Sequence, residues 1–459
     1  MLIATWIITF VLIVGIGVYA GTKITNSGQW SGNDKSMGIF AVGAVLGAWQ
    51  IGGMSIVGAA QNGYVMGIAG SWYSIANGLY ILALGVLAKT MRRNFPSDAL
   101  PDYLENRYST RVARLQSYVW IIFGLVYIPI QLKTVASILQ IVLPGFNTYL
   151  CMFIGVTIAV AYTAFAGMKG ASIVGRVVCI ATYVLLGWFI FTNIGDFGGY
   201  SGLIAQLPKG YDQLSAMSTQ QIVAWMIGGI LTSIVLQSAL QPVLAAKSDQ
   251  AATWGCVLGY VIAGPICILT AIIGMMARAK TDGLGDGATA FAWAIKDMSS
   301  PVMAGIIFAV MTMIIAATLA TMMMATGTIV TNVYKKQINP KADEKKLLPM
   351  SRLGTVAVAY VSLLLGFFIP SAQMTNMFLT VNYVVTAPFS FSVLAGMFWK
   401  KANAKGSFWS IVAGIVVALI WVLAGLNESI NVVYPTIIVC YIVGVIVSLT
   451  TNKQTFSAQ

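Results

Sequence analysis

The sequence predicts an all-α membrane protein with about thirteen transmembrane helices. Three observations indicate this class: 58% of the 459 residues are hydrophobic, only 8% are charged, and long apolar runs recur along the chain. A soluble domain carries roughly 25% charged residues, so this chain has too little charge to cover a surface in water. The five cysteines show no paired spacing and histidine is absent. This composition argues against a disulfide framework or a zinc site.

Thirteen apolar runs are long enough to cross about 30 Å of hydrocarbon. The first has neither a basic leading segment nor a convincing cleavage site, so we expect a retained helix and not a signal peptide. The connecting loops are short and no Walker A pattern is present, which argues against enzymatic activity and ATP-driven pumping. The runs lie at residues 2–22, 38–60, 66–88, 115–142, 148–166, 171–194, 221–245, 252–277, 301–333, 352–370, 373–398, 407–425 and 430–450.

The positions of lysine and arginine predict the orientation in the membrane. With thirteen spans and the N-terminus outside, 21 of the 26 basic residues fall on the cytoplasmic side and 4 on the outer side, while Lys133 lies within a span. The sequence therefore predicts a multi-pass protein of the cell inner (plasma) membrane, with the N-terminus outside and the C-terminus in the cytoplasm. The net charge of +13 then reflects this bias, with anionic lipid headgroups as the partner and not nucleic acid.

Two spans contain glycine pairs that could interrupt a helix. Residues 47–55 read GAWQIGGMS and residues 226–233 read MIGGILTS, and each pair lies at the start of a five-helix half, 38–194 and 221–398. Helices broken near the midplane free carbonyl groups and helix ends that hold ions and solutes in secondary transporters. Glycine pairs also serve ordinary helix packing in membranes, so the residues alone leave both interpretations open.

Polar side chains inside the spans are costly in lipid and mark candidate binding positions. For each glutamine or threonine, an ordinary interhelical hydrogen bond is the alternative role. We expect a solute to bind near the midplane among Gln50, Ser55, Gln131, Lys133, Thr232, Ser233, Gln237 and Asn382.

Lys133 differs from the other candidates because a lysine at mid-bilayer costs roughly 2.5–3.5 kcal/mol on the insertion scale. No Asp or Glu lies mid-span to offset its charge. The side chain must therefore face water, an anionic or carbonyl-rich solute or freed carbonyl groups, lose its proton, or extend to the interface.

Four motifs in order along the chain resemble the solute:sodium symporter family, over roughly residues 38–420. They are residues 100–108 (LPDYLENRY) with Tyr127 and Gln131, Tyr162 and Thr163 with residues 166–171 (AGMKGA), Gln237 and Gln241 with residues 244–248 (LAAKS), and Pro388 with residues 396–401 (GMFWKK) and Gly406.

The resemblance implies a LeuT-like fold and a secondary active transporter. The fold would comprise an extra N-terminal helix (1–30), inverted repeats of five helices each (38–194 and 221–398) and two C-terminal helices (407–450). The activity would be sodium-coupled symport of a small polar or anionic organic solute by alternating access. We expect a monomer without a cofactor, with Na⁺ as the coupling ion.

The resemblance also implies a sodium site between the broken first core helix and the eighth. Transferred to this sequence, its ligands are the carbonyls of Ala48, Ile51 and Ile314 and the hydroxyl of Thr318, while Ala317 takes the place of a second hydroxyl residue. Sodium prefers a shell of oxygen ligands, and four remain here.

Two further departures leave an alternative open. Gly175 stands where the family usually has an aspartate, and Arg176 follows it. The alternative is a sodium-independent carrier, either proton-coupled, exchanging or facilitative, in which Lys133 or Arg176 replaces the cation. A channel or membrane sensor is the rival class, but the sequence shows neither a repeated filter nor an output domain.

Overall fold

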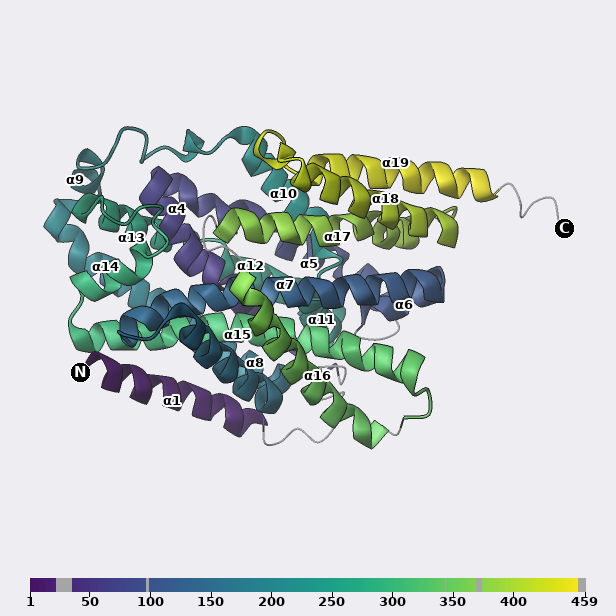
Figure 1. Cartoon of the computed structure of the whole chain (residues 1–459), viewed down its shortest axis with the longest axis horizontal. Coiled ribbons are helices and arrows are strands. Elements are labelled where there is room, and N and C mark those ends of the chain that lie inside the picture. The colour runs from purple at the N-terminus through teal and green to yellow at the C-terminus, as the bar shows by residue number, and fades with distance from the viewer. Residues whose placement is uncertain (22–34, 96–98, 343, 369–373, 453–459) are drawn as a thin grey trace.

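A computed structural model describes residues 1–21, 35–95, 99–342, 344–368 and 374–452. Within these ranges the chain is helical, and its single β-type contact is an isolated bridge between Met37 and Ala246. Most of the long helices run along the long axis of the molecule, and α1 begins at the opposite end from the one at which α19 ends (Figure 1). The all-α prediction is confirmed.

The helices follow one another along the chain with short connections. In the first half they are α1 (Leu2–Gly21), α3 (Ile39–Gln50), α4 (Ala59–Met66), α5 (Leu79–Asn94), α6 (Leu100–Arg107), α7 (Thr110–Val142), α8 (Thr148–Asn193) and α9 (Gly199–Ala205). In the second half they are α10 (Thr219–Ser233), α11 (Gln237–Leu244), α12 (Asp249–Ala263), α13 (Ile266–Lys280), α14 (Ala290–Met298), α15 (Pro301–Val333), α16 (Glu344–Leu365), α17 (Met374–Phe398), α18 (Ala404–Leu423) and α19 (Val433–Asn452).

In the described part of the chain, nine helices are long and apolar enough to cross a membrane. Two further candidates are bent pairs: Ile39–Gln50 with Met54–Ser71, at 57°, and Thr219–Ser233 with Gln237–Leu244, at 54°. The shorter apolar helices Leu2–Gly17 and Thr148–Thr163 correspond to the first and fifth predicted runs. A polytopic membrane protein is thus confirmed, while the count of thirteen spans stays a prediction.

The break in the second predicted span lies where the glycine pair predicts it. Helix α3 ends at Gln50, and the chain resumes helical structure at Met54. This broken span continues to Ser71, so the next span begins at Tyr73 and not at residue 66.

The break in the seventh predicted span is not at its glycine pair. Helix α10 continues through Gly228 and Gly229 to Ser233, and the interruption covers residues 234–236. A Cβ on Gly228 would lie 2.5 Å from the Tyr383 ring, and one on Gly229 would lie 2.6 Å from the carbonyl oxygen of Asn77. This pair therefore serves close helix packing, which is the alternative role of glycine in membranes.

Helix α15 forms the centre of the bundle. Almost every residue from Ala304 to Ile329 is buried, and a helix that is apolar all round is typical of a core position. It packs against α1, α7, α8 and α16. Because α15 also contacts α3, it connects this core to the first broken span.

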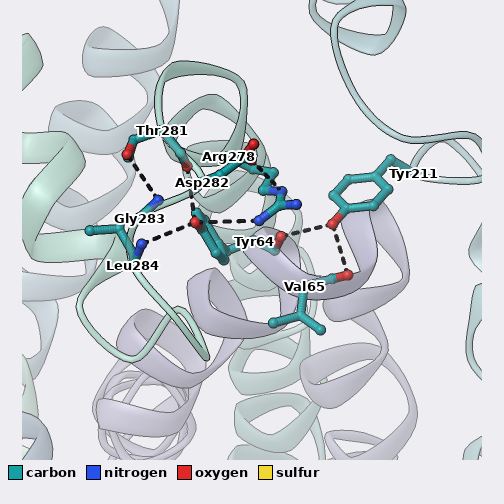
Figure 2. Close-up of polar contacts among 8 residues, drawn as sticks. All are labelled: Tyr64, Val65, Tyr211, Arg278, Thr281, Asp282, Gly283 and Leu284. Carbon is teal, nitrogen blue, oxygen red and sulfur yellow. Dashed lines mark hydrogen bonds and ion pairs between the residues drawn. The ribbon is translucent and has the colours of Figure 1, made fainter.

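A polar network holds α4, the second part of that span, against its neighbours (Figure 2). The Tyr64 hydroxyl donates to the Thr281 carbonyl at 2.9 Å, and the Arg278 guanidinium lies over the Tyr64 ring at 5.2 Å. The Tyr211 hydroxyl lies 2.9 and 2.8 Å from the carbonyl oxygens of Tyr64 and Val65 and donates to them. Burial raises the pKa of the Tyr211 phenol, which keeps this donor protonated. The network joins α4, α13 and the loop before α10.

The predicted orientation in the membrane stays a prediction. That α1 begins and α19 ends at opposite ends of the molecule agrees with an odd number of spans, but the helices alone do not say which end is outside. Of the basic residues assigned to the cytoplasmic side, the side chains of Lys23, Lys169, Lys345, Lys346 and Lys453 lie outside the described part, as do those of motif residues 166–169.

Candidate functional site

The first helix break is held open by side-chain hydrogen bonds. The Ser55 hydroxyl donates to the Gln50 carbonyl at 2.5 Å, and the Thr270 hydroxyl donates to the Ser55 carbonyl at 2.8 Å. Ile51, at the end of α3, has φ −79° and ψ 50°, which is outside the helical region. Residues 51 and 52 therefore leave the helix, and neighbouring carbonyls become available to other partners.

Thr318 of α15 lies against these carbonyls. Its hydroxyl oxygen is 3.0 Å from the Ala48 carbonyl, 3.4 Å from that of Trp49 and 3.2 Å from that of Ile314. The side chain of Thr318 is fully buried. A Cβ on Gly52 would lie 2.8 Å from the Thr318 hydroxyl, so the break and α15 are in close contact.

The structure thus brings together three of the four oxygens predicted for the cation. Ile51, whose carbonyl is the fourth, is fully buried in the same break. Ala317 is buried too, and its carbonyl accepts a hydrogen bond from Thr321. Carbonyl and hydroxyl oxygens suit a hard cation, and the C-terminal end of α3 adds a partial negative charge.

Gly175, which stands where the family usually has an aspartate, and the adjacent Arg176 have different surroundings. A Cβ on Gly175 would lie 3.0 Å from the Ala44 carbonyl, so this glycine lets α8 approach α3 closely. Arg176 is exposed, and its Nε donates to the Ser172 carbonyl at 3.2 Å. It lines a surface groove with Phe40. The expectation that Arg176 replaces the cation has no support in this geometry.

A small cavity lies beside the break. Four predicted solute-binding residues line it: Gln50, Gln131, Thr232 and Asn382. The full lining is Trp49, Gln50, Gly52, Met54, Tyr73, Asn77, Tyr80, Tyr127, Gln131, Gly229, Thr232, Leu236, Phe378 and Asn382.

The other four predicted residues are not in this lining. The Gln237 side-chain oxygen accepts from the Leu100 amide at 2.9 Å, which ties α11 to α6. The Ser233 hydroxyl donates to the Ile230 carbonyl of its own helix, and Ser55 stabilises the break. Lys133 is half-buried on α7.

Aromatic residues of the cavity were not predicted from the sequence. Trp49 stacks on Tyr127 with ring centroids 5.6 Å apart, and Phe378 meets Tyr127 edge-on at 4.9 Å. Tyr73 contacts Phe378 in the same way at 6.4 Å. Asn77 was also missed, although a polar residue within an apolar run is the signal that identified Gln50.

Several polar atoms of the lining have no hydrogen-bond partner among the described residues. They are Gln50 Nε2, Asn77 Oδ1, the Tyr80 hydroxyl and Gln131 Oε1. Because buried polar groups are usually satisfied, these atoms can bind a polar solute. None of the described residues that line the cavity is Asp, Glu, Lys or Arg.

Comparison with known proteins shows the family of the chain. A sequence model of the sodium:solute symporter family matches residues 32–414. The sodium/glucose cotransporter of Vibrio parahaemolyticus is 24% identical, covering 89% of this chain and 82% of the relative. The osmoregulated proline transporter OpuE of Bacillus subtilis (strain 168) is also 24% identical, covering 97% and 94%.

A solved structure has the same fold. It is the substrate-bound outward-open state of a Na⁺-coupled sialic acid symporter, with a TM-score of 0.81 at 15% identity over 98% of both chains. The LeuT-like fold that the motifs imply is thereby confirmed. The family match covers most of the chain, and the chain belongs to the sodium:solute symporter family.

Proposed function

We propose that this protein couples Na⁺ entry to the transport of a small polar solute of no net charge, by alternating access. The observation that supports the proposal is that the first helix break contributes to both the cation site and the solute cavity. The carbonyls of Ala48 and Trp49 lie within hydrogen-bond distance of Thr318, while Trp49, Gln50 and Gly52 line the cavity.

This shared border provides a physical route for coupling. A cation held by Ala48, Ile51, Ile314 and Thr318 would order the backbone of residues 48–52, and with it the cavity lining that the same residues form. Coupling between two ligands is reciprocal, and typical values change affinity about 5- to 150-fold. Na⁺ should then raise solute affinity, and solute should raise Na⁺ affinity by the same factor.

The lining favours a solute without net charge. It offers amides, phenols, a threonine hydroxyl and aromatic faces, with no ionised side chain among its described members. A net charge moved into such a cavity would lose its hydration without an opposite charge to replace it. An anionic solute, one of the options that the sequence leaves open, would need a positive charge such as that of Lys133, which does not line the cavity.

Orientation and assembly belong to the same proposal. The N-terminus would face outside and the C-terminus the cytoplasm of a cell whose inner membrane holds the protein as a monomer. The charge bias of 21 to 4 supports this orientation.

The experiment is a thermal-unfolding screen of the purified protein against neutral polyols, zwitterionic amino acids and organic anions. Each solute is measured in equal concentrations of NaCl, KCl and choline chloride. We expect a neutral or zwitterionic solute to raise the melting temperature more in NaCl than in the other two salts. An equal rise in all three salts would favour the sodium-independent alternative, and a response to anions alone would contradict the proposed solute class.

Substitutions at two residues of α7 distinguish a solute site at Lys133 from a solute site in the cavity. Gln131 lines the cavity, whereas Lys133 does not. We expect Gln131→Leu to raise the half-saturating solute concentration about tenfold, because a lost buried hydrogen bond costs about 1–3 kcal/mol. Lys133→Gln should stay within about twofold of wild type, since it leaves the lining intact. Initial rates of uptake into proteoliposomes measure both values.

The two variants also serve as controls for each other, because both substitutions lie on the same helix. A large rise in the half-saturating solute concentration for Lys133→Gln, with none for Gln131→Leu, would indicate that the solute binds at Lys133 and not in the cavity. A flattened pH profile in Lys133→Gln would show that Lys133 titrates during transport.

A further inference from the structure

A groove far from the solute cavity lies where α7 and α18 begin. It is lined by Ser109, Arg111, Ala404, Lys405, Phe408 and Trp409. The two helices contact each other and begin at the same end of the bundle (Figure 1). None of these residues belongs to the cavity or to the cation site.

The groove concentrates positive charge. Arg111 and Lys405 are both exposed, and neither forms an ion pair in the part of the chain that the structure describes. Neither α7 nor α18 carries an acidic residue in its first turn. Basic side chains oppose the helix dipole at this end, so helix stability does not account for them. An anion between them would offset both charges.

The groove continues into a surface that suits lipid chains. Trp409 is 53% exposed, and Val416, Ile420 and Leu423 of the same helix are exposed as well. These residues recur at helical spacing and lie on one face of α18. Because α18 is a candidate span that begins at Ala404, Lys405 lies at the level of the headgroups. Tryptophan is typical of this level.

We propose that this groove binds an anionic phospholipid, with its phosphate between Arg111 and Lys405 and an acyl chain along the exposed face of α18. The planar guanidinium of Arg111 can donate two parallel hydrogen bonds to phosphate oxygens. Lys405 supplies a second charge from the other helix. The bound lipid would join α18 to α7, the helix that carries Tyr127 and Gln131 of the cavity.

The test is native mass spectrometry of the full-length protein in detergent with added phosphatidylglycerol or phosphatidylcholine of equal chain length. We expect wild type to retain phosphatidylglycerol in preference to phosphatidylcholine. The double variant Arg111→Gln/Lys405→Gln should weaken phosphatidylglycerol binding on the order of tenfold, since each basic residue near an anionic surface contributes to attraction. Soluble glycerol phosphate should bind weakly, because it lacks acyl chains.

The matched control is Lys89→Gln/Arg93→Gln, which removes two exposed basic residues from α5. It should keep the wild-type preference, and melting temperatures without added lipid should show that both double variants are folded. Equal retention of the two lipids by wild type, or an equal loss in the control, would overturn the proposal. Equally strong binding of glycerol phosphate would overturn the part assigned to the acyl chain.

Discussion

Thr318→Ala is expected to raise the Na⁺ concentration for half-maximal transport about tenfold or more. The Thr318 hydroxyl is the side-chain oxygen among three converging carbonyls, those of Ala48, Trp49 and Ile314. A hydrogen-bonding or ligand contact to a charged group contributes about 1.5–3 kcal/mol. Since Ala317 supplies no second hydroxyl, nothing adjacent on α15 can take over this contact. The measurement is solute uptake into proteoliposomes over a range of Na⁺ concentrations.

The matched control for this variant is Thr326→Ala. Thr326 is also fully buried on α15, and its hydroxyl donates at 2.9 Å to the Met322 carbonyl of its own helix. It should leave the Na⁺ dependence within about twofold of wild type, because it removes a methyl and a hydroxyl without touching the break. Equal shifts in the two variants would mean that Thr318 acts through packing alone. Uptake by wild type that is indifferent to Na⁺ would reject the cation site itself.

The sequence could predict the helical class because this class depends on local properties. Apolar runs of sufficient length require helices in lipid, where each backbone polar group needs an internal partner. Gln50, Gln131, Thr232 and Asn382 could be identified because a polar side chain in such a run has a cost that needs a reason.

Gln237 met the same criterion, but its side chain bonds to the backbone of another helix and does not line the cavity. Its partner, the Leu100 amide, is 137 residues away in the chain, and nothing local to Gln237 announces it. The aromatic residues of the cavity were missed for the opposite reason. Tyr73, Tyr127 and Phe378 are buried, and aromatic side chains are ordinary core residues, so their sequence context does not distinguish a cavity wall from packing.

The two glycine pairs show the same limit most clearly. Both read Ile-Gly-Gly in the sequence, yet only the first coincides with a break. Gly228 and Gly229 face the Tyr383 ring and the Asn77 carbonyl, whereas Gly52 and Gly53 face side chains of α15 and α7. The difference lies in the opposing helices, which a reading of the pair itself cannot supply.

Gly53→Ala is therefore expected to abolish transport. An added Cβ would overlap the Thr134 hydroxyl and lie 2.6 Å from Thr134 Cβ and 2.7 Å from Gln131 Oε1. Thr134 cannot easily turn away, because its hydroxyl donates at 2.7 Å to the Gln131 carbonyl. The methyl group would push α7 away from the break, and forced overpacking of this kind costs about 1–3 kcal/mol or more. Solute uptake by the reconstituted variant measures the loss, and melting temperature reports whether it folds.

The control for a helix glycine in a membrane span is Gly187→Ala on α8, where an added Cβ meets no atom within 4 Å. It should transport at close to the wild-type rate. The double variant Gly53→Ala/Thr134→Gly removes the opposing side chain and should recover part of the activity, since neighbouring substitutions that share a contact are not additive. Recovery would attribute the loss to the contact between the break and α7. Wild-type kinetics in Gly53→Ala alone would mean that this close contact does not exist in the working protein. The proposal that the first helix break lines both the cation site and the cavity would then be wrong.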